Sequence, residues 1–505
     1  MLKYLFPLIF IIQCATNCIA QPLDKSFGNN GVLITPFDTY QYGNGDNIYA
    51  IAQQKDGKVV SSDSYFRIVR FLPNGKVDSS FAINGRIEEV FTGYESPTSS
   101  SVIIRADGKI IVSGSASSNS TSATQTDFIV ARYLPDGSID KTFNGTGYQS
   151  IDLYPTWPGQ DYCYGAALQA DDKILLCGSG ANEFAIVRLK ENGMVDSSFG
   201  NNGIYRKSYG NYGSYFRRVA IRANGKIIAG GVADFGGTDD RFCLLQLMPN
   251  GQPDSSFGVN GLAEISPDSG GIVHDMAVQP DSKVILLGRD VFTGGVMVRF
   301  NIDGSPDSTF GANGIAEIIS PKGVAGPEQI ELSADGHLYI AGHIYVNKYF
   351  EDVFFVKCNN NGTIDSSFVG GGLVLSLGDD RERIHAMLVQ TDGKILMAGE
   401  YRDSVSVYQY LLLRFNQFPE SVSKLNAVLK PIAIYPNPIS SKFIVRAAAD
   451  GVLFIQNSLG QVIQKMVVRK GDSKLNFPDV PTGMYSCIYI SDDNEVYCKR
   501  VLKVQ

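Results

Sequence analysis

The chain has 505 residues, which is too long for one ordinary core and indicates a large repeat domain or several domains. Hydrophobic residues make up 44% and charged residues 19%, which excludes a disordered chain. The net charge is −7 and no run of Lys and Arg occurs, which argues against nucleic acid as a partner.

The N-terminal segment is typical of a secretory signal peptide. Lys3 precedes a short apolar run over residues 5–12, and the small residue Ala20 provides a cleavage site. We therefore expect residues 1–20 to be removed. The run is too short to span a bilayer, and no other run is long enough, so no transmembrane segment is expected after cleavage.

Three short phrases recur in fixed order after the leader, two of them seven times and the third with substitutions such as Gln246 and Lys357 in place of its Arg. The first is Asp-x-Ser/Thr-Phe, repeated on average about every 57 residues. It begins at Asp24, Asp78, Asp140, Asp196, Asp254, Asp307 and Asp365. The second is Asp-Gly-Lys or a near variant, beginning at Asp56, Asp107, Asp171, Asn224, Asp281, Asp335 and Asp392. The third is an Arg-aromatic pair before Asn/Asp-Gly, as in residues 70–75.

Runs of Ile, Val and aromatic residues between these phrases predict four strands in each unit, and the Asp-Gly and Asn-Gly pairs supply tight hairpin turns. Seven such units predict a seven-bladed β-propeller over residues 21–416, so the fold class is all-β. The chain enters the repeat at a fourth strand and leaves it after a third. A strand near residues 32–34 is therefore expected to pair with residues 411–415 and close the ring.

The repeated phrases resemble the bacterial delta-60 repeat family, as in Leu23-Asp24-Lys25-Ser26-Phe27. The resemblance implies the propeller fold and no activity. The Asp of the first phrase is interpreted as a turn cap, its Phe as a core anchor, and the recurrent Arg as a packing or hydrogen-bonding residue.

After a linker at 417–430, alternating apolar and polar residues in 431–505 predict a small antiparallel, Ig-like β-sandwich. Its phrases resemble the C-terminal sorting domain of type IX (Por) secretion in Bacteroidetes. The residues that carry the sorting motif are Tyr435, Pro436, Asn437, Pro438, Gly483 and Tyr485. The resemblance implies the type IX translocon and a sortase as partners, and delivery through the periplasm and outer membrane to the cell surface or the medium. The alternative is an ordinary terminal β-sandwich used in adhesion.

Cys487 and Cys498 flank an expected hairpin turn near residues 492–493. We expect them to face each other at bridging distance, where export permits a disulfide. The alternative is a pair of apolar residues under the sheet. The dispersed cysteines of the repeats are expected to act as small buried hydrophobes, namely Cys163, Cys177, Cys243 and Cys358.

No familiar catalytic or metal-binding spacing occurs. The chain has four His residues without His-x-x-x-His or Cys-x-x-Cys spacing, no nucleophile elbow and no P-loop. We therefore expect no catalytic residue, no metal site and no cofactor, and we expect that the protein is not an enzyme.

Loop lengths indicate where a ligand binds. The turns between first and second and between third and fourth strands keep one length, whereas the other connections vary and share one face. The position seven residues before each Asp-Gly-Lys phrase is expected at the start of the innermost strand, around the channel mouth on that face. It holds Tyr49, Ser100, Tyr164, Arg217, His274, Glu328 and His385. This ring suits a polar ligand such as a sugar; the alternative is a set of solvated loop ends.

The sequence leaves three functions open. An exported binding module for a polysaccharide or a protein is the first. A carbohydrate-active enzyme, such as a glycosidase or lyase on a propeller, is the second, and a purely structural envelope protein is the third. Fold alone does not choose among them.

Overall fold

The computed structural model describes most of the two predicted domains. The described residues are 23–36, 47–88, 91–118, 125–155, 159–236, 239–267, 270–290, 294–318, 324–333, 336–345, 351–365, 368, 372–377, 381–403, 407–416, 433–436, 439–447, 449–456, 462–491 and 496–504. The predicted signal peptide 1–20, the linker 417–430 and the motif residues Asn437 and Pro438 lie outside them. The chain divides into two compact units, one of which comprises Pro22–Gln417.

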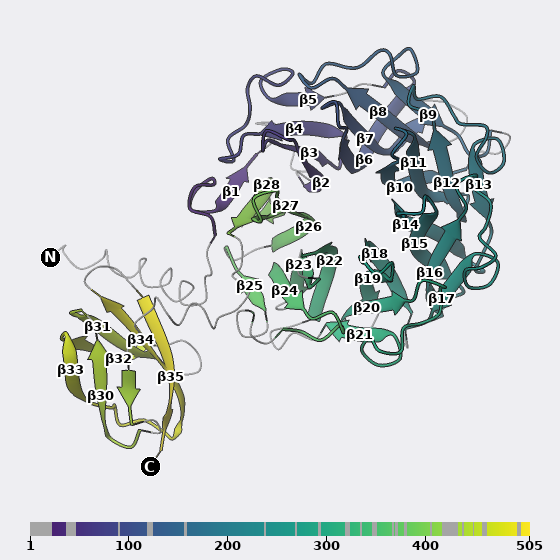
Figure 1. Cartoon of the computed structure of the whole chain (residues 1–505). Helices are drawn as coiled ribbons and strands as arrows, with labels where there is room; N and C mark the ends of the chain where they lie inside the picture. The colour runs from purple at the N-terminus through teal and green to yellow at the C-terminus, as the bar shows by residue number, and fades with distance from the viewer. Residues whose placement is uncertain are drawn as a thin grey trace. The chain divides into compact units, whose positions relative to one another are not determined.

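The first unit consists of strands that form antiparallel groups of four around a ring (Figure 1). The first strands, on the inside of the ring, are β2 (Ile48–Gln53), β6 (Tyr94–Ile104), β10 (Asp161–Leu168), β14 (Gly213–Ile221), β18 (Gly271–Val278), β22 (Val324–Leu332) and β26 (Arg381–Val389). The second strands are β3 (Val59–Asp63), β7 (Ile110–Ser118), β11 (Ile174–Gly180), β15 (Ile227–Asp234), β19 (Val284–Asp290), β23 (Leu338–Tyr345) and β27 (Ile395–Arg402).

The third strands are β4 (Arg67–Phe71), β8 (Thr126–Tyr133), β12 (Glu183–Leu189), β16 (Asp240–Leu247), β20 (Gly294–Phe300), β24 (Glu351–Cys358) and β28 (Tyr408–Phe415). The fourth strands are β5 (Arg86–Glu88), β9 (Tyr148–Ile151), β13 (Ile204–Lys207), β17 (Leu262–Ile265), β21 (Ile315–Ile318), β25 (Leu373–Leu375) and, for the last group, β1 (Val32–Thr35).

The ring is closed by the N-terminal strand, as the sequence predicts. Strand β1 pairs antiparallel with β28, with Leu33 opposite Leu412. The groups β22–β25 and β26–β28 with β1 are joined by a single bridge between Glu351 and Arg381. The all-β propeller fold is therefore confirmed, and β1 satisfies the edge that β28 would otherwise expose.

The repeated phrases build the turns and the core. The Asp24 carboxylate accepts hydrogen bonds from the backbone N–H of Ser26 at 3.0 Å and from its hydroxyl at 2.7 Å. The Phe of each phrase is buried, from Phe81 at 0% exposed to Phe368 at 7%. The predicted roles as turn cap and core anchor are confirmed, and the four dispersed cysteines of the repeats are also buried.

The recurrent Arg joins neighbouring blades. Arg132 donates from Nε to Asp140 at 2.7 Å and from Nη1 to the Glu191 carbonyl of the next blade at 2.6 Å. Its guanidinium also lies 4.8 Å from the ring centroid of Phe143. At the closure, Arg414 makes the equivalent contacts with Asp24 at 2.9 Å and with the Pro73 carbonyl. The predicted hydrogen-bonding role is confirmed, and it holds adjacent blades in register.

These buried ion pairs predict acid sensitivity. Burial alone would raise the pKa of Asp24, Asp140 and Asp307, but hydrogen bonds from Ser or Thr and the nearby Lys and Arg charges hold each pKa well below its usual range. A carboxyl group whose pKa is lower in the folded state than in the unfolded state stabilises the fold at pH values above its unfolded-state pKa. This stabilisation is lost as the pH falls from that value toward the folded-state pKa. The melting temperature of the propeller is therefore expected to drop as the pH falls below about 4.

A pH series of thermal melts checks this. Asp140→Asn is expected to show a shallower decline below that pH, because it removes one of the linked groups. The same substitution at Asp107, whose side chain is 44% exposed, serves as the control. An equal slope for Asp140→Asn and the unaltered protein would contradict the assignment.

The C-terminal unit contains two antiparallel sheets. One sheet comprises β29 (Ala433–Tyr435), β30 (Lys442–Ala447) and β33 (Gly471–Asn476). The other comprises β31 (Gly451–Gln456), β32 (Val462–Val468), β34 (Gly483–Ser491) and β35 (Val496–Lys503). Phe443 and Val445 of the first sheet and Leu453 and Tyr489 of the second belong to one buried cluster, so this unit has its own core.

The hairpin β34–β35 corrects the expected disulfide geometry. Cys487 lies opposite Lys499, and Cys498 lies opposite Ile488. The two cysteines are therefore offset by one residue rather than directly opposed. The pairing of the two strands is centred on residue 493 rather than between residues 492 and 493, which shifts the register by one residue. The predicted direct opposition of the two cysteines is therefore off by one residue, and a disulfide between them stays a prediction.

Candidate functional site

The seven residues predicted to ring the channel share one backbone feature. Each is the extra residue of a β-bulge on a first strand, where the pairing with the second strand shifts by one. The interrupted pairs flank Tyr49, Ser100, Tyr164, Arg217, His274, Glu328 and His385. Most lie inside the strand rather than at its start, which corrects the expected position. A bulge re-aims side chains, and it does so here at the same height in every blade.

A small residue opposite the bulge makes it possible. Gly178 of β11 pairs with Cys163, and a Cβ at Gly178 would lie 1.8 Å from the Tyr162 carbonyl oxygen. The same close approach occurs at Gly114, Gly231, Gly288, Gly342 and Gly399. In the first blade the position is Asp63, and β2 begins at the residue paired with it, Ile48. The strand therefore does not continue past the bulge there, and a side chain fits.

The structure brings the ring together. One cavity of ≈ 330 Å³ is lined by six of its seven members: Tyr49, Ser100, Tyr164, Arg217, Glu328 and His385. The seventh, His274, contacts Glu328, with 3.0 Å between Nδ1 and Oε2. Ser64, which follows β3, also lines the cavity. The ring therefore lies at the end of the blades where the connections vary in length.

Glu328 is the electrostatic centre of one side. His274 of β18 and His343 of β23 both face it, with His343 Nδ1 at 3.8 Å. Burial alone would raise the pKa of Glu328, but the hydrogen bond and charge of His274 hold this pKa well below its usual range. Burial lowers the pKa of His343 to about 4, so its imidazole is neutral at pH 7. The pair of Glu328 and His274 can therefore accept and donate hydrogen bonds at one point.

Aromatic rings and charges also surround Tyr49 and His385, on the two blades that follow Glu328 around the ring. The Tyr49 ring lies 4.8 Å from that of His385, whose Nε2 is 3.8 Å from Glu400. Burial, and then the charges of Glu400 and Glu328, raise the pKa of Tyr49, so its hydroxyl remains a donor. A second cavity of ≈ 370 Å³ adjoins these residues and includes Arg383, which pairs with Glu351.

Tyr164 and Arg217 form a third group. The Arg217 guanidinium lies 5.4 Å from the Tyr164 ring centroid. Tyr162 stacks beside Tyr164 at 6.1 Å and is 36% exposed. Stacked tyrosines beside a guanidinium, with Tyr162 exposed and Tyr164 half-buried, offer both an apolar face and hydrogen-bond donors, which is the combination that a sugar ring requires.

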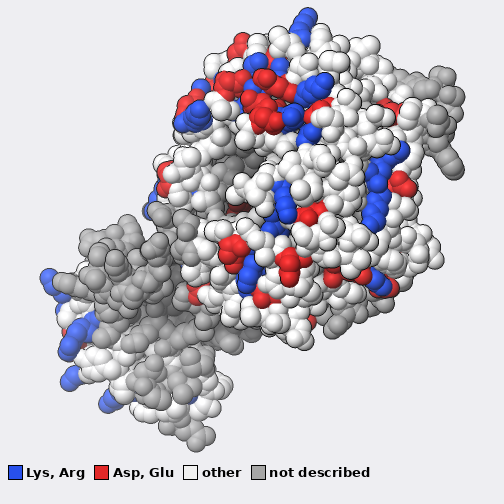
Figure 2. All heavy atoms as spheres, turned by 45° about the vertical axis from the view of Figure 1, so that its right-hand side comes forward, with Lys and Arg blue, Asp and Glu red and all other residues white. Residues whose placement is uncertain are grey.

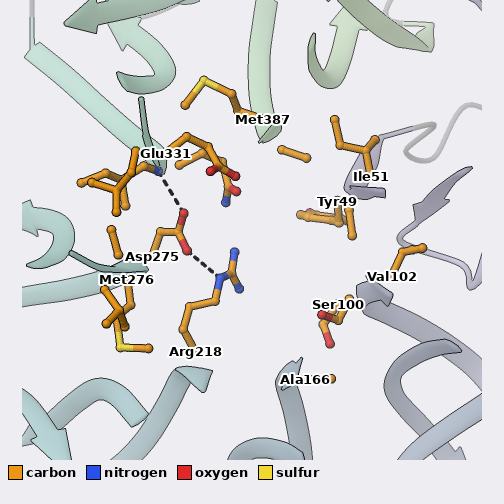
Figure 3. A pocket seen from close by; sticks show the side chains of 18 residues that line it. Tyr49, Ile51, Ser100, Val102, Ala166, Arg218, Asp275, Met276, Glu331 and Met387 are labelled. Carbon is orange, nitrogen blue, oxygen red and sulfur yellow. Dashed lines mark hydrogen bonds and ion pairs between the residues drawn. The ribbon is translucent and has the colours of Figure 1, made fainter. Parts of the chain in front are cut away.

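Sequence reasoning missed a second layer deeper in the channel. All seven first strands line a cavity of ≈ 390 Å³, shown in Figure 3. Arg218 donates to Asp275 at 2.7 Å, and Asp275 also accepts the N–H of Ile330 at 2.9 Å. Burial, and then the charge of Asp275, raise the pKa of Glu331 to about 8, so this carboxyl is largely protonated at pH 7.

A signal for this layer exists in the sequence. Arg218 and Asp275 stand one residue after ring positions, where other blades carry Ala50, Gly165 or Ala386. Charged residues among small ones at an aligned inner position indicate a use other than packing. His343 has no such signal, because it lies on a second strand and comes beside Glu328 through the pairing of β22 with β23.

The sorting motif lies in the second unit. Tyr435 ends β29, and its hydroxyl donates to Asp472 at 3.0 Å. Gly483 begins β34, and the Tyr485 hydroxyl donates to the Pro481 carbonyl at 2.8 Å. These residues place turns and strand ends of the small domain.

Acidic and basic side chains are intermixed on the face shown in Figure 2, and no extended basic patch is seen there. Within the described part of the chain, no helix has the length and apolar character needed to cross a membrane.

Two family models match the chain. Residues 54–81, 105–143, 169–199, 222–257, 279–310 and 333–368 match the model described as "Domain of unknown function (DUF5122) beta-propeller". Residues 433–504 match the "Secretion system C-terminal sorting domain". The comparison with curated proteins gave no match.

Several solved structures are similar at low identity. A protein of unknown function from Dyadobacter fermentans is 11% identical, with 64% of this chain and 94% of that chain covered and a TM-score of 0.40. PorZ, a surface component of the type IX secretion system of Porphyromonas gingivalis, is 9% identical, with 91% and 81% covered and a TM-score of 0.28. A gluconolactonase from Xanthomonas campestris is 12% identical, with 76% and 97% covered and a TM-score of 0.34.

Proposed function

For this secreted or surface β-propeller of DUF5122 repeats, which carries a type IX sorting domain, we propose the role of a binding module for a polar ligand, with polysaccharide as the favoured class. The ligand would enter the channel mouth on the face with variable connections. The observation that supports this is the convergence of the bulge residues around one cavity of ≈ 330 Å³.

The chemistry of the ring supports a sugar. Tyr162 and Tyr164 offer aromatic faces, and Arg217 lies beside them. Across the cavity, Glu328 with His274 accepts and donates hydrogen bonds. Sugar hydroxyls need both kinds of partner, and recognition sites generally combine aromatic surface with a few well-placed polar groups. A protein ligand that presents a polar side-chain cluster would use the same groups.

Replacing Tyr49, Arg217, His274 and His385 together with Ala is expected to weaken binding at least about tenfold, because charged hydrogen bonds and ring contacts are both lost. The purified protein is first screened against a glycan array and isolated cell-surface proteins, and the affinity for the best ligand is then measured by calorimetry.

The control replaces Lys76, Lys141 and Lys190 with Ala, all exposed at or near the turns between third and fourth strands. This variant is expected to bind normally. Circular dichroism shows whether both variants are folded. Unchanged affinity in the folded ring variant would refute the site.

A second candidate function is supported by the contact between His274 and Glu328. A carboxylate and an imidazole 3.0 Å apart at a channel mouth can move a proton, as glycosidase or lyase chemistry requires. This activity predicts cleavage of a polysaccharide in a panel assay and its loss in Glu328→Gln. Binding without cleavage supports the binding module instead.

A further inference from the structure

Three carboxylates converge where the second blade passes into the third. Asp127 lies in β8, Asp152 follows β9, and Asp161 begins β10. One carboxylate oxygen of each lies within 4.8 Å of those of the other two. The group is separate from the ring residues and lies outside the repeated phrases.

Two of these side chains carry buried oxygens without partners. Asp127 is 4% and Asp161 is 1% exposed. In each, Oδ2 accepts a hydrogen bond, from the Tyr94 hydroxyl and the Leu153 N–H respectively, both at 2.7 Å. In each, Oδ1 is buried and accepts none. A buried carboxylate oxygen without a donor is costly, so a further partner is required at this point.

Within the described part of the chain, no basic side chain supplies that partner. Among the described residues, none forms an ion pair with these three carboxylates. Arg206 approaches, but its Nη1 donates to the Leu153 carbonyl at 2.6 Å and its guanidinium lies over the Tyr154 ring at 4.2 Å. The cluster is therefore deficient in positive charge.

We propose that Asp127, Asp152 and Asp161 bind a divalent cation of the Ca²⁺ type between the second and third blades. The protein ligands are carboxylate oxygens without nitrogen or sulfur, which is the donor set that hard cations prefer. The ligands come from two adjacent blades, so the cation would cross-link them. It would also coordinate the buried carboxylate oxygens that accept no hydrogen bond. The proposal does not depend on the polar ligand of the channel.

The test uses the purified protein, stripped with EDTA and titrated with CaCl₂ at pH 8. A hundredfold excess over Kd is expected to raise the melting temperature of the propeller by about 3 °C. Asp127→Asn and Asp161→Asn are each expected to abolish this rise. In EDTA neither variant should melt below the unaltered protein, because each substitution removes a repelled, buried carboxylate.

Terbium luminescence excited through tyrosine gives a readout that does not depend on stability, since Tyr94 contacts Asp127 directly. The luminescence is expected in the unaltered protein, where Ca²⁺ should abolish it by displacing Tb³⁺, and it should be absent from both variants. Asp239→Asn is the control, because that carboxylate is 51% exposed and pairs with Arg241 at 3.1 Å. No response to Ca²⁺ in the unaltered protein, or a full response in Asp127→Asn and Asp161→Asn, would overturn the proposal.

Discussion

Replacing Gly178 with Ala is expected to lower the free energy of unfolding of the propeller by about 3 kcal/mol. The new Cβ would lie 1.8 Å from the Tyr162 carbonyl oxygen and 2.8 Å from its carbonyl carbon. Both atoms are backbone and are fixed in the pairing of β10 with β11, so no side-chain rotation relieves the clash. The bulge that presents Tyr164 would have to open.

Chemical denaturation of the purified protein measures this loss. Gly213→Ala is the matched control, because Gly213 also lies in a strand but a Cβ there would meet its nearest neighbour at 3.6 Å. That variant is expected to stay within about 0.5 kcal/mol of the unaltered protein. Equal stability of Gly178→Ala and Gly213→Ala would show that the bulge does not depend on this glycine.

Truncation after residue 430 is expected to abolish surface display while leaving the propeller folded in the periplasm. The removed segment contains the whole match to the sorting domain, residues 433–504. Its buried cluster runs from Ile434 to Val501 and takes no residue from the propeller. The propeller closes through β1 and β28, which both remain. The truncated chain therefore keeps its own core and loses only the sorting domain.

Cell fractionation and protease accessibility of intact cells measure display. Thermal melting of the truncated protein, compared with the propeller transition of the full chain, separates retention from misfolding. Surface display at the level of the full chain, with the same fold, would refute the role of the C-terminal domain in sorting.

Two acidic side chains of the channel differ in protonation. Glu328 remains ionised beside His274, whereas Glu331, deeper in the channel, holds its proton at pH 7. The mouth thus offers an acceptor with a donor beside it, and the interior offers a neutral acid.

Much of the architecture can be predicted from the sequence because every blade of a propeller repeats the same turn and strand patterns. Asp-Gly and Asn-Gly specify the hairpin turns, and the buried Phe of each phrase specifies one core position per blade. Constant spacing then places Tyr49, Arg217 and their five counterparts at one height, since every blade has the same strand geometry. The sorting domain is legible for a different reason, namely its motif at Tyr435 and Gly483.

Only the tertiary structure decided what those positions do. The bulges depend on how closely the second strand approaches the first, as at Gly178. The partners of Glu328 depend on the pairing of β22 with β23, which brings His343 beside it, and on the neighbouring blade, which supplies His274. Asp127, Asp152 and Asp161 converge from two blades, although their spacing in the sequence matches no known metal-binding loop. In the C-terminal unit, the register of β34 with β35 offsets Cys487 from Cys498 by one residue. Local sequence specifies turns and strands, whereas contacts between blades arise only when the ring closes.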